Sequence, residues 1–262
     1  MTGTLFLLPN QITEGDPTLT LPAATVDVAR TCRRFLAENA KSARHFLKAI
    51  GHPTPISDLE IVEIGHEPDQ KQFEQWLSPI LAGIDTAIVS ESGCPGVADP
   101  GASLVDVATQ LGIEIKPLVG PCSILLTLMA SGMNGQRFRF LGYLPIADDP
   151  RADALRSLER ASRQNETQLF IETPYRNNKL LAAMTEILAL DTRITAATDI
   201  TGSGEHIRTM SVKAWRDHLD SLPKLPTVFA VLAAQRPSTK GHTVCKPANK
   251  PKPTRRSGAS RR

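Results

Sequence analysis

The sequence has no pair of cysteines at Cys-x-x-Cys spacing, and its cysteines and histidines do not form a set with the spacing of a zinc site. Its four cysteines are far apart, and its six histidines are scattered along the chain. A structural zinc site needs about four such ligands, usually in closely spaced pairs. We therefore expect no metal ion. The four cysteines are Cys32, Cys94, Cys122 and Cys245.

Long hydrophobic runs are also absent. A helix needs about 20 consecutive apolar residues to span a bilayer, and no stretch approaches that length. The first residues, Met1 to Leu5, lack the basic start and the cleavage site of a secretory signal. We expect a soluble, cytoplasmic protein with no membrane association.

Two common nucleotide-binding motifs are missing. The sequence contains no Gly-x-Gly-x-x-Gly fingerprint and no P-loop. These glycine patterns place backbone N–H groups against phosphates at the start of a helix. Nothing in the sequence therefore supports a Rossmann-type fold of the kind common among methyltransferases, or a nucleotide hydrolase.

Acidic residues are absent from residues 236–262, which contain nine Lys or Arg. The rest of the chain therefore has 21 basic and 27 acidic residues, a net charge of −6, although the whole chain has +3. This segment is rich in proline and poor in large apolar residues, so we expect a disordered tail. A basic arm suits a polyanion such as RNA, but it could equally serve only to solubilise the chain.

Short apolar runs alternate with helical patterns, as in α/β proteins with a largely parallel sheet. The strands are expected at 5–8, 59–64, 86–89, 113–118, 168–171, 194–197 and 228–233. The helices are expected at 69–82, 103–111, 124–129, 151–163, 176–189 and 211–221. Residues 35–37 fit either a helix end or a short strand.

A Pro- and Gly-containing segment at 117–121 predicts a hinge between two α/β domains. The expected division is 1–118 for the first domain, 119–235 for the second and 236–262 for the tail. After the hinge, the apolar helix at 124–129 should be buried on most sides and should stop at Gly132.

Ser90 to Gly101 (SESGCPGVADPG) contains three glycines and two prolines directly after an apolar strand. In open α/β sheets, ligands bind where a strand ends in such a turn, because glycines let the backbone approach the ligand. An ordinary tight turn needs only one or two special residues. The excess therefore favours a binding loop.

Four segments together resemble the tetrapyrrole methylase superfamily, in particular its branch of bacterial small-subunit rRNA (cytidine-2′-O-)-methyltransferases or an uncharacterised sister group. They are 90–101, 120–123, 170–176 and 201–205, in the order of that family. The resemblance implies two α/β domains with an S-adenosylmethionine cleft between them, a methyltransferase activity and a homodimer. The cofactor-binding residues implied by position are Pro9, Ser92, Gly93, Cys94, Val97, Cys122, Ser123, Glu172 and Ile200.

The sequence departs from that branch on the substrate side. The family's Ala-Thr-Pro-Ile-Gly-Asn segment is replaced here by 8–13, which keeps Pro9 and loses the glycine. Its Glu-Asp-Thr-Arg segment keeps only Glu38, and Glu91 replaces the usual Asp. The substrate-side candidates are Glu38, Arg44, His66, Glu91, Arg176 and Glu205.

No catalytic residue is assigned. Methyl transfer from a sulfonium mainly needs in-line alignment, although a ribose hydroxyl acceptor benefits from a base. Glu38, Glu91 and Glu205 are candidates for that base. Each also has a structural alternative: Glu38 as a helix cap, Glu91 as an acceptor within its loop and Glu205 as a partner of Arg208. Arg44, Arg176 and His66 are candidates for phosphate contacts.

Three functions are compatible with these features. The first is methylation of RNA, at a ribose 2′-oxygen of ribosomal RNA, with RNA or the small ribosomal subunit as partner. The second is methylation of a tetrapyrrole-type small molecule in an enclosed apolar pocket. The third is S-adenosylmethionine binding without methyl transfer.

Overall fold

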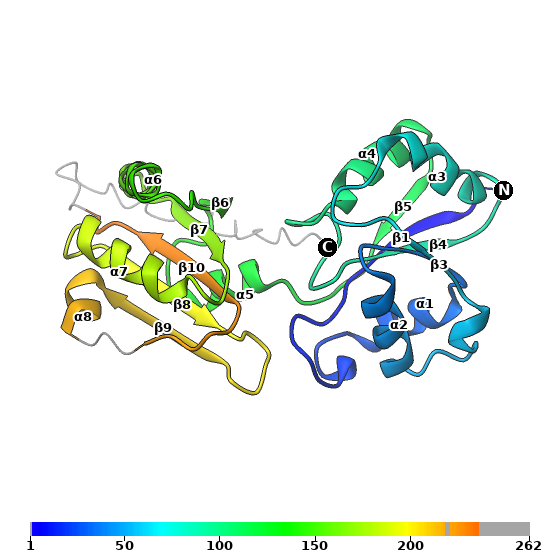
Figure 1. The fold of residues 1–262 in the computed structure, drawn as a ribbon, viewed down its shortest axis with the longest axis horizontal. Coiled ribbons are helices and arrows are strands. Elements are labelled where there is room, and N and C mark those ends of the chain that lie inside the picture. Colours follow the sequence, from blue (N-terminus) through cyan, green and yellow to red (C-terminus); the bar gives the residue numbers. More distant parts are fainter. Residues whose placement is uncertain (1, 218–220, 236–262) are drawn as a thin grey trace, which may run out of the picture.

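The structure is a computed structural model that describes residues 2–217 and 221–235. The basic tail, 236–262, lies outside the described residues, so its disorder and its RNA contact stay predictions. The described strands form two five-stranded sheets, one from the first part of the chain and one from the second (Figure 1). We call the parts built on them the first and second lobes. No helix in the described residues has both the length and the apolarity to cross a bilayer.

The first lobe contains a fully parallel sheet in the order β3-β2-β4-β1-β5. Its strands are β1 (Thr4–Leu8), β2 (Arg34–Ala37), β3 (Glu60–Glu63), β4 (Thr86–Val89) and β5 (Glu114–Pro117). Residues 35–37 therefore belong to a strand. Its helices are α1 (Ala23–Thr31), α2 (Ala40–Ala49), α3 (Phe73–Leu81) and α4 (Gly101–Gln110), with short 3-10 turns at Pro17–Leu19, Ile56–Asp58 and Gln70–Gln72.

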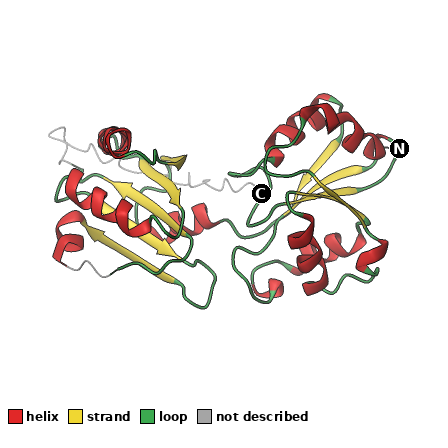
Figure 2. Cartoon of the chain, viewed as in Figure 1, coloured by secondary structure: helices red, strands yellow, loops and turns green. Residues whose placement is uncertain are grey.

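Helices cover both faces of this sheet (Figure 2). α1 and α2 pack with Phe35 and Val89 on one face, whereas α3 and α4 pack with Leu36 and Ile88 on the other. Strands buried on both faces are mostly apolar along their length, which is why three consecutive apolar residues follow Arg34 in β2 and Thr86 in β4.

The second lobe has a mixed sheet in the order β6-β7-β10-β8-β9. Its strands are β6 (Phe138–Tyr143), β7 (Thr167–Glu172), β8 (Arg193–Thr198), β9 (His206–Ser211) and β10 (Thr227–Leu232). Only β6 and β7 run parallel, and the other three pairings are antiparallel. The expectation of a largely parallel sheet is therefore wrong for this lobe. A short loop after β8 forces β9 to run back along it, since parallel neighbours need a long crossover.

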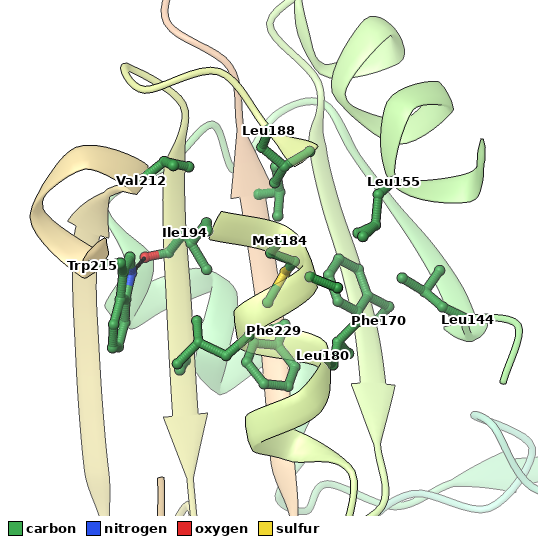
Figure 3. Close-up of a cluster of buried hydrophobic side chains, with 14 of the residues drawn as sticks. Leu144, Leu155, Phe170, Leu180, Met184, Leu188, Ile194, Val212, Trp215 and Phe229 are labelled. Atoms are coloured by element: carbon green, nitrogen blue, oxygen red, sulfur yellow. Dashed lines mark hydrogen bonds between the residues drawn. The ribbon is translucent and has the colours of Figure 1, made fainter. Parts of the chain in front are cut away.

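One face of the second sheet is covered by α6 (Asp148–Ser162), α7 (Asn177–Ile187) and α8 (Val212–Asp217). Figure 3 shows the core between these helices and the sheet, where Phe170 and Phe229 stack with ring centroids 5.8 Å apart. Trp215 is fully buried and donates its indole N–H to the carbonyl of Ile194 at 3.0 Å. This satisfied polar atom allows an indole to fill the core.

The other face of the second sheet is covered by α5 (Ser123–Ser131). Ile124 and Leu128 contact the sheet, but Leu125 is 48% exposed and Met129 is 77% exposed. The prediction of a helix buried on most sides is wrong, because α5 packs on the sheet with one side only. Its predicted stop is confirmed, since Gly132 ends the helix in the left-handed conformation, with φ of 62°.

We expect Phe229→Ala to lower the free energy of unfolding of the second lobe by about 3–5 kcal/mol, because it leaves a cavity beside Phe170. Urea unfolding would be followed by the fluorescence of Trp215 in a Trp76→Phe background, since the chain has 2 tryptophans. Leu190→Ala, at a side chain 51% exposed, is the control and should change stability by less than about 0.5 kcal/mol. Similar losses in both variants would contradict this description of the core.

Candidate functional site

A cavity of about 340 Å³ lies between the two lobes. The first lobe contributes the turn after β4 and the segment after β1, and the second contributes the start of α5 and the ends of β7, β8 and β10. Its lining residues are Ile12, Thr13, Ser92, Gly93, Cys94, Val97, Ala98, Cys122, Ser123, Ile124, Tyr143, Ile171, Glu172, Ala197, Asp199, Ile200, Pro226, Thr227 and Val228. We call it the interlobe cavity.

The glycine-rich turn forms one wall of this cavity. Gly93 and Gly96 have φ of +71° and +77°, values that side chains other than glycine rarely adopt. The Asp99 carboxylate accepts hydrogen bonds from the backbone N–H groups of Gly96 and Gly101, at 3.0 and 2.8 Å. A Cβ on Gly101 would lie 2.7 Å from that carboxylate. The turn therefore needs its glycines for its own closure as well as for the cavity wall.

Asn10 ties the segment after β1 to this turn. Its backbone N–H donates to the carbonyl of Gly93 at 2.9 Å. Its side-chain amide donates to the carbonyls of Ser90 and Glu91, at 3.2 Å each. Asn10 is 5% exposed, so these bonds are shielded from water and hold the two segments together.

The connection between the lobes passes directly over Pro9. A Cβ on Gly120 would lie 2.3 Å from the Pro9 Cβ, closer than real atoms approach. The hydroxyl of Thr25 in α1 donates to the carbonyl of Val119 at 2.7 Å and fixes the preceding residue. Only glycine at position 120 therefore allows this path.

The opposite wall includes a second loop, between β8 and β9. Asp199 and Thr201 have φ of 51° and 69°, which is unusual for residues with a side chain. The Asp199 carboxylate accepts from the backbone N–H of Gly204 at 2.8 Å, and a Cβ on Gly202 would lie 2.3 Å from it. The loop 199–205 thus winds around one carboxylate.

Eight of the nine residues expected to bind the cofactor line the interlobe cavity: Ser92, Gly93, Cys94, Val97, Cys122, Ser123, Glu172 and Ile200. The ninth, Pro9, is buried beneath Gly120 and is not among the lining residues. The structure therefore brings together four segments that are far apart in the sequence.

Several lining residues were not expected from the sequence, among them Tyr143, Asp199 and Thr227. Asp199 had a detectable signal, because it stands between a strand and a loop containing Gly202 and Gly204. Tyr143 and Thr227 lie at strand ends in stretches without unusual composition. Nothing in their local sequence distinguishes them.

Glu172 and Arg176 form an ion pair at the rim of the cavity. The guanidinium of Arg176 donates to one carboxylate oxygen of Glu172 at 2.6 and 2.8 Å, and the backbone N–H of Thr173 donates to the same oxygen at 2.6 Å. The side chain of Glu172 is only 4% exposed. Arg176, a substrate-side candidate, is therefore engaged in holding this carboxylate.

Three of the other candidates meet at one edge of the first sheet. Glu38, His66 and Glu91 follow β2, β3 and β4, which are neighbours whose carboxyl ends lie together. Nδ1 of His66 lies 2.5 Å from a carboxylate oxygen of Glu38. The backbone N–H of Glu91 donates to the other oxygen of Glu38 at 3.3 Å. One ligand atom from each of the three residues lies within 4.8 Å of the others, a spacing that a cation tolerates.

The pKa of His66 is raised, because it hydrogen-bonds the Glu38 carboxylate and lies near the negative charges of Glu38, Glu91 and Glu63. Glu38 is not a helix cap, since Asn39 caps α2 by accepting from the N–H groups of Lys41 and Ser42. His66 is thus paired with an acid, and its contact with a phosphate stays a prediction.

The remaining candidates have simpler surroundings. Glu91 accepts from the hydroxyl of Ser42 in α2 at 3.1 Å, so its carboxylate contacts a neighbouring helix and not its own loop. Glu205 accepts from the backbone N–H of Thr201 at 2.8 Å and closes its own loop. Arg44 is exposed on α2.

A second cavity, of about 580 Å³, adjoins the first and shares Ile12 and Thr13 with it. We call it the polar cavity, because most of its lining side chains are polar or charged. The lining residues are Asn10, Gln11, Ile12, Thr13, Glu14, Asn39, Lys41, Ser42, His45, Phe46 and Glu91. The side-chain oxygen of Gln11 is buried and has no hydrogen-bond donor within the described part of the chain. Such an atom is costly unless a donor reaches it.

The sequence matches the family model described as Tetrapyrrole (Corrin/Porphyrin) Methylases over residues 14–214. It is 34% identical to the Ribosomal RNA small subunit methyltransferase I of Vibrio cholerae over 146 residues, 55% of this chain and 50% of that protein. It is 28% identical to the protein of the same name from Pseudomonas aeruginosa over 220 residues, 84% and 74% of the two chains. The first match thus spans only half the length of its relative.

A solved structure shares the fold. The uroporphyrin-III-C-methyltransferase from Thermus thermophilus superposes with a TM-score of 0.53 at 18% identity, over 88% of this chain and 93% of that one. The expected α/β fold of this type is thereby confirmed. At this identity the likeness concerns the fold alone.

We expect Glu38→Gln to lower the pKa of His66 more than Glu91→Gln does, because Glu38 contributes a hydrogen bond and the nearer charge. A raised histidine pKa means that the charged pair is present below about pH 6.5 and is lost as pH rises through the raised value. An NMR titration of the His66 ring would measure the pKa in each variant. Equal decreases, or none in Glu38→Gln, would contradict the pairing.

Proposed function

The chain belongs to the tetrapyrrole (corrin/porphyrin) methylase family, and from that premise we propose that it transfers a methyl group from S-adenosylmethionine to a ribose 2′-hydroxyl of ribosomal RNA. The names of its relatives support the RNA acceptor. The observation that carries the proposal is the interlobe cavity, walled by main chain and joined to a polar cavity.

The interlobe cavity suits the methyl donor. Its volume of about 340 Å³ is within the range of small-molecule sites. At Gly93 the backbone itself forms the wall, so a ligand meets N–H and C=O groups directly. Val97, Ile171 and Val228 offer apolar surface for a base, while Ser92 and Asp199 offer polar atoms. S-adenosylmethionine, when bound, supplies a methyl group activated by a positively charged sulfur.

The cofactor-binding residues that we propose are the eight that line the cavity. Pro9 would act indirectly, by setting the path of Gly120. Glu172 and Asp199 place negative charge near a cationic donor, but both carboxylates already accept local hydrogen bonds. Their role is to hold the walls in position and to favour a positive ligand, and neither has to move a proton.

The polar cavity is the proposed site of the acceptor nucleotide. Gln11 offers a buried acceptor atom there that a base amino group or a ribose hydroxyl would satisfy. Lys41 and His45 line the same cavity, and Arg44 lies beside them on α2, so that phosphates have positive partners. Glu91 is the one base candidate among Glu38, Glu91 and Glu205 that lines this cavity.

A homodimer is proposed as the working form. Leu125 and Met129 on α5 are exposed apolar side chains, and Met129 borders a shallow pocket with Ile200 and Ile207. A contiguous apolar surface of this kind is typical of a protein–protein contact.

We also propose a cytoplasmic location, where ribosomal RNA is found. The proposed domain limits are 1–118 and 119–235, which agree with the division of the strands between the two sheets.

Incubation of the purified chain with methyl-labelled S-adenosylmethionine tests this proposal. Total RNA, small ribosomal subunits and small-molecule extract from a strain lacking the gene would be offered separately. We expect label in small-subunit RNA, at a ribose after nuclease digestion. Label in a porphyrin-like molecule would favour the tetrapyrrole alternative, and donor binding without any labelled fraction would favour a binding protein.

Gly93→Ala provides a matched variant for this experiment. It adds a methyl group at the cavity wall, and we expect donor affinity, measured by calorimetry, to fall at least ~10-fold, or ~1.4 kcal/mol. Gly112→Ala has almost the same backbone strain, with φ of +70°, but lies where an added Cβ meets nothing within 4 Å. Equal effects on donor affinity in both variants would contradict the assigned wall.

The tail makes a separate prediction. Deleting 236–262, or replacing its nine Lys and Arg by Gln at constant length, should flatten the salt dependence of RNA binding. The slope of log K against log salt should fall by up to about 6 if every basic residue contacts a phosphate of single-stranded RNA. Binding titrations at several salt concentrations measure it. An unchanged slope in both variants would leave the tail as a solubilising segment.

A further inference from the structure

Two cysteines from the two lobes meet in the wall of the interlobe cavity. Cys94 lies in the glycine-rich turn and Cys122 at the start of α5, and their thiols are near enough that each shifts the pKa of the other. Sγ of Cys94 is also 3.4 Å from the carbonyl oxygen of Pro121, the residue before Cys122. Both side chains are half-buried and line the cavity, so small solutes can reach them.

The surroundings favour ionisation of one of the two thiols. Cys94, and then the backbone N–H groups of Leu125 and Ile124, lower the pKa of Cys122. Cys122 is the N-cap residue of α5, where exposed N–H groups and the helix dipole favour a thiolate. The neighbouring Cys122 thiol, followed by burial, raises the pKa of Cys94. Of the two thiols, Cys122 is therefore the one that ionises more readily.

Cys32 shows the contrasting environment. It is 2% exposed within the core of the first lobe, and burial followed by the charge of Asp85 raises its pKa to about 11. A buried neutral thiol of this kind reacts slowly with oxidants. The described residues thus contain one paired, accessible set of thiols and one inert thiol.

We propose that Cys94 and Cys122 are an oxidative modification site, at which a peroxide converts the two thiols into an intramolecular disulfide that excludes the methyl donor. The disulfide would tie Gly93 and its turn to the first turn of α5. It would also replace two separate side chains in the cavity wall by one covalent bridge. The effect on the donor rests on the proposed function, whereas formation of the disulfide does not.

The reaction balances with hydrogen peroxide as the oxidant. The Cys122 thiolate attacks one peroxide oxygen, so that an S–O bond forms, the O–O bond breaks, and hydroxide leaves and takes up the proton lost by Cys122. The Cys94 sulfur then attacks the Cys122 sulfur, the S–S bond forms and the S–O bond breaks. The second hydroxide leaves with the Cys94 proton. Two thiols and one peroxide thus give one disulfide and two waters.

Peptide mapping tests the disulfide. The full chain would be used in a Cys245→Ser background, because Cys245 lies outside the described residues. After treatment with hydrogen peroxide, non-reducing mass spectrometry should show the peptides of Cys94 and Cys122 joined, with the loss of two hydrogens, while Cys32 stays reduced. In Cys94→Ser, a sulfenic-acid trap should label Cys122, whereas in Cys122→Ser it should label Cys94 much less. Free thiols at both positions after treatment, or separate overoxidation of each, would overturn the proposal.

Calorimetry tests the consequence for the donor. Oxidation of the parent should weaken S-adenosylmethionine binding at least ~10-fold, and a phosphine reductant should restore it. In Cys94→Ser and Cys122→Ser, peroxide should leave the affinity of each variant at its own untreated value. Conversely, saturating S-adenosylmethionine should slow disulfide formation in the parent, since the two events are coupled.

The outcomes separate the two proposals. If the reduced protein gives no heat with S-adenosylmethionine, the proposed function fails and the peptide map still decides whether the disulfide forms. If the reduced and the disulfide forms bind the donor equally, exclusion of the donor is wrong although the function stands. If peroxide weakens binding equally in the parent and in both serine variants, another group is responsible and the site is wrong.

Discussion

The contact between Gly120 and Pro9 determines how the two lobes of this chain are joined. Because a single added carbon would lie 2.3 Å from the proline ring, the backbone has one narrow path from the first sheet to α5. That path brings Pro121 and Cys122 against the turn after β4, and Asn10, the neighbour of Pro9, holds the same turn by three hydrogen bonds. The segment containing Asn10, the turn after β4 and the linker at Gly120 therefore meet at the end of β1. The interlobe cavity lies beside this meeting point.

The strands of the first lobe were more predictable from the sequence than those of the second because they are more deeply buried, although its helices α1 and α2 were not expected. Helices cover both faces of β2 and β4, so the residues that follow Arg34 and Thr86 in these strands are all apolar. Such a run marked 86–89 as a strand, although 35–37 also fitted a helix end. β6 and β9 are half-exposed edge strands that contain Arg139, His206 and Arg208, and neither was expected as a strand. Strand direction was not encoded in these local patterns, which is why the antiparallel pairings of β10 were missed.

The site was predictable where the backbone itself forms it. A turn with three glycines indicates an unusual backbone path. Eight of the nine residues assigned by resemblance line one cavity. Side chains that join the site through strand order were harder to find. Glu38, His66 and Glu91 come together because β3, β2 and β4 are neighbours in the sheet. Local sequence patterns do not predict that strand order. The sequence suggested Glu38 as a helix cap, but Asn39 caps α2 instead. The pairing of Glu38 with His66 was not predicted.

The position of β10 affects how the chain folds during its synthesis on the ribosome. All strands of the first sheet come from residues up to 117, so that lobe can complete its pairing while the remainder is still being synthesised. The second sheet cannot, since its central strand is the last of the described strands to be made and must enter between β7 and β8. Until Thr227–Leu232 has been synthesised, one edge of β7 and one edge of β8 lack a hydrogen-bonding partner. During that interval these edges can pair with a wrong strand.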